Sequence, residues 1–151
     1  MELTSGAFKN GEDMPRRYTG AGDDISPGLK WSGVPDGTES FVLIMDDPDA
    51  PGGTWVHWVM YNIPKDVKGL VEDVPKERVL TEGAGQGKNS FGRIGYGGPH
   101  PPPGPAHRYV FTLYALDTAL NLAPGADKSA VSKAMQGRVL DKAQLTGMFG
   151  R

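Results

Sequence analysis

The sequence predicts one mainly β domain, a β-rich α+β fold covering residues 1–151. Its length of 151 residues is the usual size of a single domain and allows a substantial core. It contains 22 glycines and 13 prolines without a regular period, which is too many for a helical bundle and typical of a chain with many turns. Three apolar, aromatic or β-branched stretches have the pattern of strands.

The first predicted strand spans residues 41–45 and ends at Asp46 and Asp47. The second spans residues 55–62, where strict alternation groups four side chains on one face: Trp55, His57, Val59 and Tyr61. The third spans residues 107–116, with His107 and Tyr109 on one face and Arg108 on the other. Because both faces of the second and third stretches are largely apolar, we expect these strands near the centre of a sheet.

Residues 64–106 lose this pattern and are rich in glycine, proline and charge. So long an irregular stretch inside a compact domain is usually functional. A helix is predicted near residues 127–136, with Asp127 or Ser129 as its N-cap and Gly137 as its stop.

Composition excludes several classes of function. The 16 basic and 18 acidic residues nearly balance, without a basic block, so we expect no nucleic-acid partner. No apolar run can span a bilayer and the first residues lack a secretory leader pattern, so we expect a cytoplasmic protein. Cysteine is absent, which excludes thiol catalysis. Gly87 and Lys88 look like the end of a nucleotide-binding loop, but Glu82 stands where its first glycine is needed.

Four side chains that can exchange protons lie at the ends of the predicted strands: Asp47, His57, His107 and Tyr109. Ends of antiparallel strands can meet at one edge of a sheet, so these groups can converge. A single histidine is more often an ordinary buried residue than a ligand. Here two histidines lie beside glycine- and proline-rich loops and the third, His100, lies inside one, which together favour a binding site.

Two segments resemble the signatures of the phosphatidylethanolamine-binding protein family. Asp47-Pro48-Asp49-Ala50-Pro51 followed by His57-Trp58 is similar to the first, and Gly98-Pro99-His100-Pro101-Pro102-Pro103-Gly104 running into His107-Arg108-Tyr109 is similar to the second. Asn89-Ser90-Phe91-Gly92 and Leu145-Thr146-Gly147-Met148-Phe149-Gly150-Arg151 resemble the bacterial and archaeal branch, the Raf-kinase-inhibitor-like proteins. The chain departs from many bacterial members at His100, where a cysteine is common.

The resemblance implies a large central antiparallel sheet, a smaller second sheet and a few peripheral helices. It also implies an anion pocket, for which we select eight candidate ligand-binding residues: Asp47, His57, His107, Tyr109, Trp55, His100, Pro101 and Pro102. Bacterial relatives further suggest a homodimer.

We therefore expect a binding or regulatory module whose ligand is phosphate, a phosphomonoester or a phospholipid headgroup. Such a module could modulate a kinase or hydrolase partner. We expect no catalytic residue, cofactor or metal. Histidines, the Tyr109 hydroxyl and backbone amides can donate hydrogen bonds to the anion. Asp47 would then accept a proton from a singly charged phosphate or keep a histidine charged, which should raise the pKa of His57 or His107. Arg108 is expected outside the pocket.

Two alternatives stay open at this point. Two histidines and one carboxylate also compose the ligand set of a metal-dependent hydrolase or oxygenase. The domain could instead inhibit a protein partner through another surface, with the pocket secondary.

Overall fold

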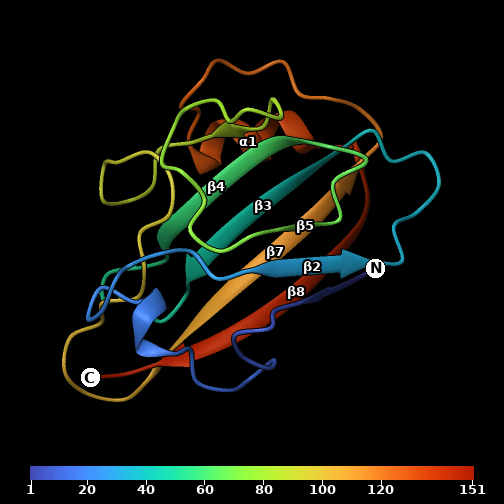
Figure 1. Ribbon diagram of the computed structural model, residues 1–151. Coiled ribbons are helices and arrows are strands. Elements are labelled where there is room, and N and C mark those ends of the chain that lie inside the picture. Colours follow the sequence, from blue (N-terminus) through green and yellow to red (C-terminus); the bar gives the residue numbers. More distant parts are fainter.

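The computed structural model describes all residues, 1–151. Two antiparallel sheets form the domain (Figure 1). The five-stranded sheet has the order β6-β4-β3-β7-β8, and its strands are β3 (Ser40–Asp47), β4 (Trp55–Pro64), β6 (Gly85–Gln86), β7 (His107–Leu116) and β8 (Val139–Phe149). The three-stranded sheet has the order β1-β2-β5, and its strands are β1 (Glu2–Thr4), β2 (Leu29–Ser32) and β5 (Gly69–Leu70). The predicted mainly β fold with a large and a small antiparallel sheet is confirmed.

Strand β3 forms the centre of the large sheet, between β4 and β7. Its side chains alternate between two apolar cores. Phe41, Leu43 and Met45 face the core between the two sheets, whereas Val42 and Ile44 face a smaller core under α1 (Lys128–Met135). Both faces of the strand are therefore buried, which explains why its sequence is a continuous apolar run.

The three predicted strands are all present, and each is part of the large sheet. The predicted helix is present as α1, and the Asp127 carboxylate caps it by accepting a hydrogen bond from the Ala130 amide at 2.9 Å. One further turn of 3-10 helix covers Arg16–Tyr18. No helix is long and apolar enough to cross a membrane.

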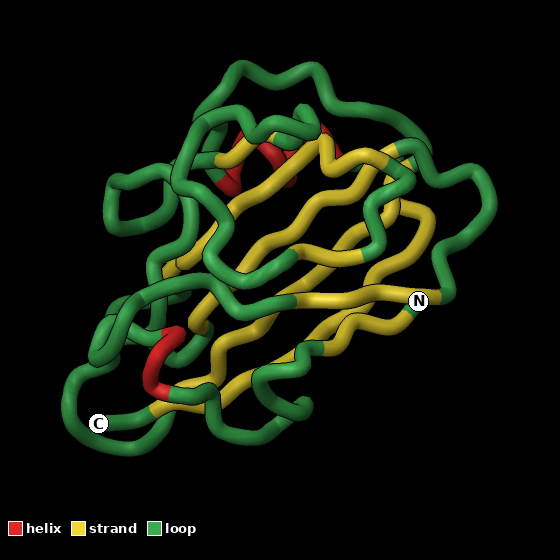
Figure 2. Tube along the Cα trace, viewed as in Figure 1, coloured by secondary structure: helices red, strands yellow, loops and turns green.

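The long irregular stretch contains β5 and β6, and then runs from Gln86 to His107 without a further strand or helix (Figure 2). Backbone hydrogen bonds nevertheless fix parts of it against β4. The Gly97 amide donates to the His57 carbonyl at 3.0 Å, and the Ser90 amide donates to the Val56 carbonyl at 2.8 Å. This loop consequently forms a wall beside the first residues of β4.

Candidate functional site

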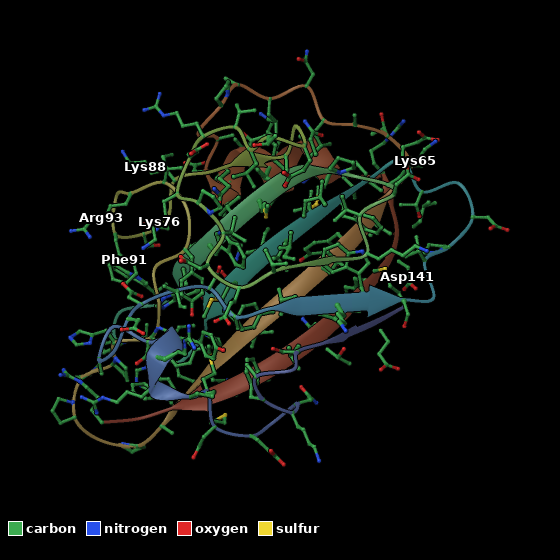
Figure 3. All side chains as sticks on the ribbon, viewed as in Figure 1. Lys65, Lys76, Lys88, Phe91, Arg93 and Asp141 are labelled. Carbon is green, nitrogen blue, oxygen red and sulfur yellow. The ribbon has the colours of Figure 1, made fainter.

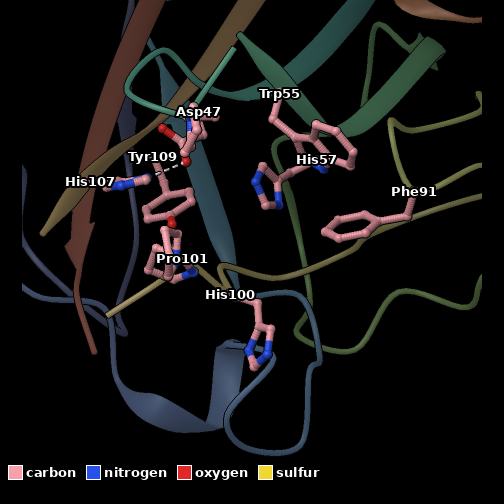
Figure 4. A pocket seen from close by; sticks show the side chains of 11 residues that line it. Asp47, Trp55, His57, Phe91, His100, Pro101, His107 and Tyr109 are labelled. Atoms are coloured by element: carbon pink, nitrogen blue, oxygen red, sulfur yellow. Dashed lines mark hydrogen bonds and ion pairs between the residues drawn. The ribbon is translucent and has the colours of Figure 1, made fainter. Parts of the chain in front are cut away.

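One end of the large sheet carries a small cavity of about 170 Å³ (Figure 4). Strand β3 ends there, while its neighbours β4 and β7 begin there, because β3 runs antiparallel to both of them. The structure brings all eight residues selected from the sequence to the lining of this cavity: Asp47, His57, His107, Tyr109, Trp55, His100, Pro101 and Pro102. Ala50, Pro51 and Phe91 complete the lining.

A β-bulge in β4 places His57 in the cavity. Met45 of β3 pairs with Trp58, but the next residue, Asp46, pairs with Val56, so His57 is the additional residue. The bulge reverses the alternation along β4. The prediction that His57 shares a face with Val59 and Tyr61 is therefore wrong: those two residues pack in the core under α1, while His57 contacts Tyr109.

The Asp47 carboxylate is buried and each of its oxygens accepts a hydrogen bond. Oδ2 lies 2.7 Å from Nδ1 of His107, and Oδ1 accepts from the backbone amide of Asp49 at 2.8 Å. The second bond closes a turn within Asp47-Pro48-Asp49, which holds the carboxylate at the end of β3. Since Asp47 engages Nδ1, the other ring nitrogen of His107, Nε2, is the one available to a ligand.

His57 is held in a defined protonation state. Its Nδ1 lies 2.5 Å from the carbonyl oxygen of Gly97, which can only accept, so Nδ1 carries the hydrogen. Burial lowers the pKa of His57 and outweighs both that hydrogen bond and the Asp47 charge, so the expectation of a pKa raised by Asp47 is wrong for His57. At neutral pH the ring is uncharged and Nε2 presents a lone pair.

Tyr109 lies between the two histidine rings. Its ring stacks on His107 with centroids 6.4 Å apart and meets His57 edge-on at 5.2 Å. Burial, followed by the nearby Asp47 charge, raises the pKa of Tyr109 well above its ordinary value. The hydroxyl therefore stays protonated.

Aromatic side chains form the outer rim. Trp55 is 38% exposed and Phe91 is 43% exposed, and their rings meet edge-on at 5.4 Å. Phe91 also meets His57 edge-on at 5.4 Å. Its place in the rim was missed from the sequence, where Phe91 contributed only to the family resemblance. His100 stands at the mouth, with its ring directed away from His107 (Figure 4).

Arg108 does not line the cavity, in agreement with the prediction. Its guanidinium forms two hydrogen bonds with the Asp49 carboxylate, from Nε at 3.0 Å and from Nη2 at 2.8 Å. These hydrogen bonds lower the pKa of Asp49 to about 2. Arg108 is thus paired with the loop after β3 and leaves the cavity without a permanent cation.

The polar side chains of the cavity include two histidines and one carboxylate, residue types that can bind a metal ion. No group of three or more His, Cys, Asp or Glu side chains is arranged to hold a metal, so Asp47, His57 and His107 do not form a three-ligand site. Instead the cavity combines an acceptor at His57, a donor at Tyr109 and the Asp47–His107 pair, joined at 2.7 Å.

The two-sheet fold and this small polar cavity define a class of mainly β proteins with a ligand-sized site at one end of the large sheet. Residues 4–150 match the family model described as phosphatidylethanolamine-binding protein. The chain belongs to the phosphatidylethanolamine-binding protein family.

Several relatives extend this match over the whole chain. The UPF0098 proteins of Aquifex aeolicus and Methanothermobacter thermautotrophicus are each 52% identical, and the alignments cover 100% of this chain and 89% and 99% of theirs. A crystal structure of a phosphatidylethanolamine-binding protein homologue from Chlamydia trachomatis is similar with a TM-score of 0.91, at 39% identity, over 99% of this chain and 97% of that chain.

Proposed function

We propose that this protein is a binding or regulatory module, and not an enzyme, whose cavity takes a phosphate group carrying a single negative charge. The observation that carries the proposal is the pair of buried Asp47 and partly buried His107, joined at 2.7 Å, on the wall of a cavity that also presents His57 and Tyr109. A volume of about 170 Å³ has room for one phosphate-sized group.

Charge selects the protonation state of the ligand. Asp47 supplies a negative charge, Arg108 is paired outside, and burial keeps His57 neutral. A doubly charged phosphate would therefore be repelled by Asp47 without a permanent cation to offset it. A singly charged phosphate still carries an O–H group, which can donate to Nε2 of His57.

The remaining oxygens of such a ligand need donors. The Tyr109 hydroxyl supplies one, because it stays protonated. Inorganic phosphate, a phosphomonoester and a phospholipid headgroup present the same group, and the proposal covers this shared chemistry. Modulation of a kinase or hydrolase partner, a cytoplasmic location and a homodimer stay predictions.

An NMR titration of the ¹⁵N-labelled protein with inorganic phosphate, and separately with sulfate, tests the proposal. Sulfate has a similar shape but carries no proton near neutral pH, so we expect weaker binding. Tyr109→Phe should weaken phosphate binding about tenfold, because a hydrogen bond to a charged group is lost, and Arg108→Gln should leave it unchanged.

Equal affinity for phosphate and sulfate, or chemical-shift changes away from His57, His107 and Tyr109, would overturn the proposal. Tight zinc or iron binding at His57 and His107 would instead favour the metal-dependent enzyme. Size-exclusion chromatography with light scattering on the same sample measures whether the protein is a homodimer.

A further inference from the structure

A second and larger cavity, of about 470 Å³, lies next to the cavity that contains Asp47, His57, His107 and Tyr109, which we call the first cavity. Phe91 and His100 line both cavities, so the two share a wall at these side chains. The second cavity is also lined by Lys76 and Arg93, neither of which lines the first cavity. A ligand that fills the first cavity can therefore continue into the second across the rim.

The shared wall is held in place by the loop from Asn89 to Gly95. The Asn89 side chain accepts hydrogen bonds from the amides of Phe91, at 3.0 Å, and Arg93, at 3.1 Å. It also donates to the Gly95 carbonyl at 2.9 Å, and Asn89 is itself buried. The side chains of Phe91 and Arg93 consequently extend from a turn whose conformation is fixed by hydrogen bonds. The second cavity is therefore formed before any ligand binds.

Unpaired positive charge distinguishes the second cavity from the first. Lys76 and Arg93 are exposed, neither takes part in an ion pair, and Figure 3 shows both on the side of the molecule that carries Phe91. One carboxylate, that of Asp24, also lines the cavity, but it accepts a hydrogen bond from the Gly98 amide at 2.7 Å. Two cations against one carboxylate leave a net positive charge.

We infer that the natural ligand is a small molecule with two anionic groups, one bound in the Asp47–His107 cavity and one bound by Lys76 and Arg93 beyond Phe91. This inference rests on the proposed function for the first group. The two cavities require different anions, because the first contains a carboxylate that disfavours a double charge, whereas the second offers two cations and accepts it. Phe91 and His100 would contact the spacer between the groups.

The test uses bisphosphates of 1,2-ethanediol, 1,4-butanediol and 1,6-hexanediol, each compared by calorimetry with the monophosphate of the same diol. The monophosphate has the same length but lacks the second charge. We expect one spacer length to bind about ten- to a hundredfold more tightly than its monophosphate, with shorter and longer spacers gaining less.

Matched variants show which residues produce the higher affinity of the bisphosphate over its monophosphate. Lys76→Gln and Arg93→Gln should each reduce this gain in affinity severalfold and leave the affinity for inorganic phosphate unchanged. Lys88→Gln is the control, because Lys88 is a nearby exposed and unpaired cation that lines a different cavity. It should keep the full gain, since it removes the same charge from outside the proposed site.

Bisphosphates that bind no more tightly than the monophosphates would overturn the inference and leave the proposed function standing. An equal loss in the Lys88→Gln variant would also overturn it, because the gain would then come from general attraction to a positive surface. If inorganic phosphate and every diol phosphate fail to bind, both the proposed function and this inference are wrong.

Discussion

The close approach of Phe91 to Gly97 predicts how the wall of the cavity that contains Asp47, His57 and His107 responds to one added methyl group. A Cβ at residue 97 would lie 2.7 Å from Cδ2 and from Cε2 of the Phe91 ring. Gly97 does not have a positive φ, so its backbone accepts alanine and the ring is the nearest obstacle. We expect Gly97→Ala to turn Phe91 toward solvent and away from Trp55 and His57.

The magnitude follows from the contacts that Phe91 loses. Its two edge-on partners, Trp55 and His57, both lie 5.4 Å away, and an aromatic pair contributes about 0.5–1.5 kcal/mol. Because Phe91 is already 43% exposed, the lower end of that range applies, and the free energy of unfolding should fall by about 1 kcal/mol. Loss of the ring also exposes His57, so its pKa, lowered by burial, should rise toward the ordinary value of about 6.5.

Urea unfolding gives the free energy, and an NMR titration of the ring protons gives the pKa of His57. Gly6→Ala is the matched control, because a Cβ there meets no heavy atom within 4 Å. In a Phe91→Ala background, Gly97→Ala should cost nothing further. The reasoning is refuted if the cost is the same in both backgrounds, or if the pKa of His57 does not move.

Three further results are expected. Gln86→Leu should lower the free energy of unfolding by about 2–4 kcal/mol, because the buried Gln86 amide accepts a hydrogen bond from Trp58 Nε1 and donates to two backbone carbonyls. A loss under about 0.5 kcal/mol in urea unfolding would contradict this. Arg108→Gln should raise the pKa of Asp49 from about 2 toward its ordinary value near 3.9, measured by NMR, and an unchanged pKa would count against the ion pair. A chelator should leave the melting temperature unchanged, because the two apolar cores stabilise the fold, and a fall of several degrees would show a structural metal.

The central strands could be predicted from the sequence because burial on both faces makes their residues largely apolar. Strand β8 was not predicted, although it pairs with β7 along its whole length. It lies at the edge of the sheet, so only some of its side chains, such as Ala143 and Leu145, are buried, and polar residues interrupt the pattern. Its identity as a strand comes from pairing with β7, which no local signal in residues 139–149 displays.

Four residues of the site, Asp47, His57, His107 and Tyr109, could be predicted because the ends of neighbouring antiparallel strands meet at one edge, and the other four candidates followed from the family resemblance. The orientation of His57 could not be predicted, because no pattern in the sequence indicates the β-bulge. Strict alternation places that ring on the opposite face of the sheet. The role of Phe91 was also hidden. It depends on hydrogen bonds from Asn89 within a loop that has no periodic pattern.

The central claim is that the cavity selects a singly charged phosphate because Asp47 lies in its wall. Calorimetric titration of methyl phosphate into the wild-type protein and the Asp47→Asn variant, at pH 6, 7 and 8 in buffers of different ionisation enthalpy, tests it most directly. A phosphomonoester loses its second proton with a pKa of about 6, so binding at pH 8 must take up about one proton. Wild-type affinity should therefore fall by up to about tenfold for each pH unit between 6 and 8, and Asp47→Asn should flatten this dependence. An affinity that is constant or rises with pH, or a variant with the wild-type profile, would contradict the claim.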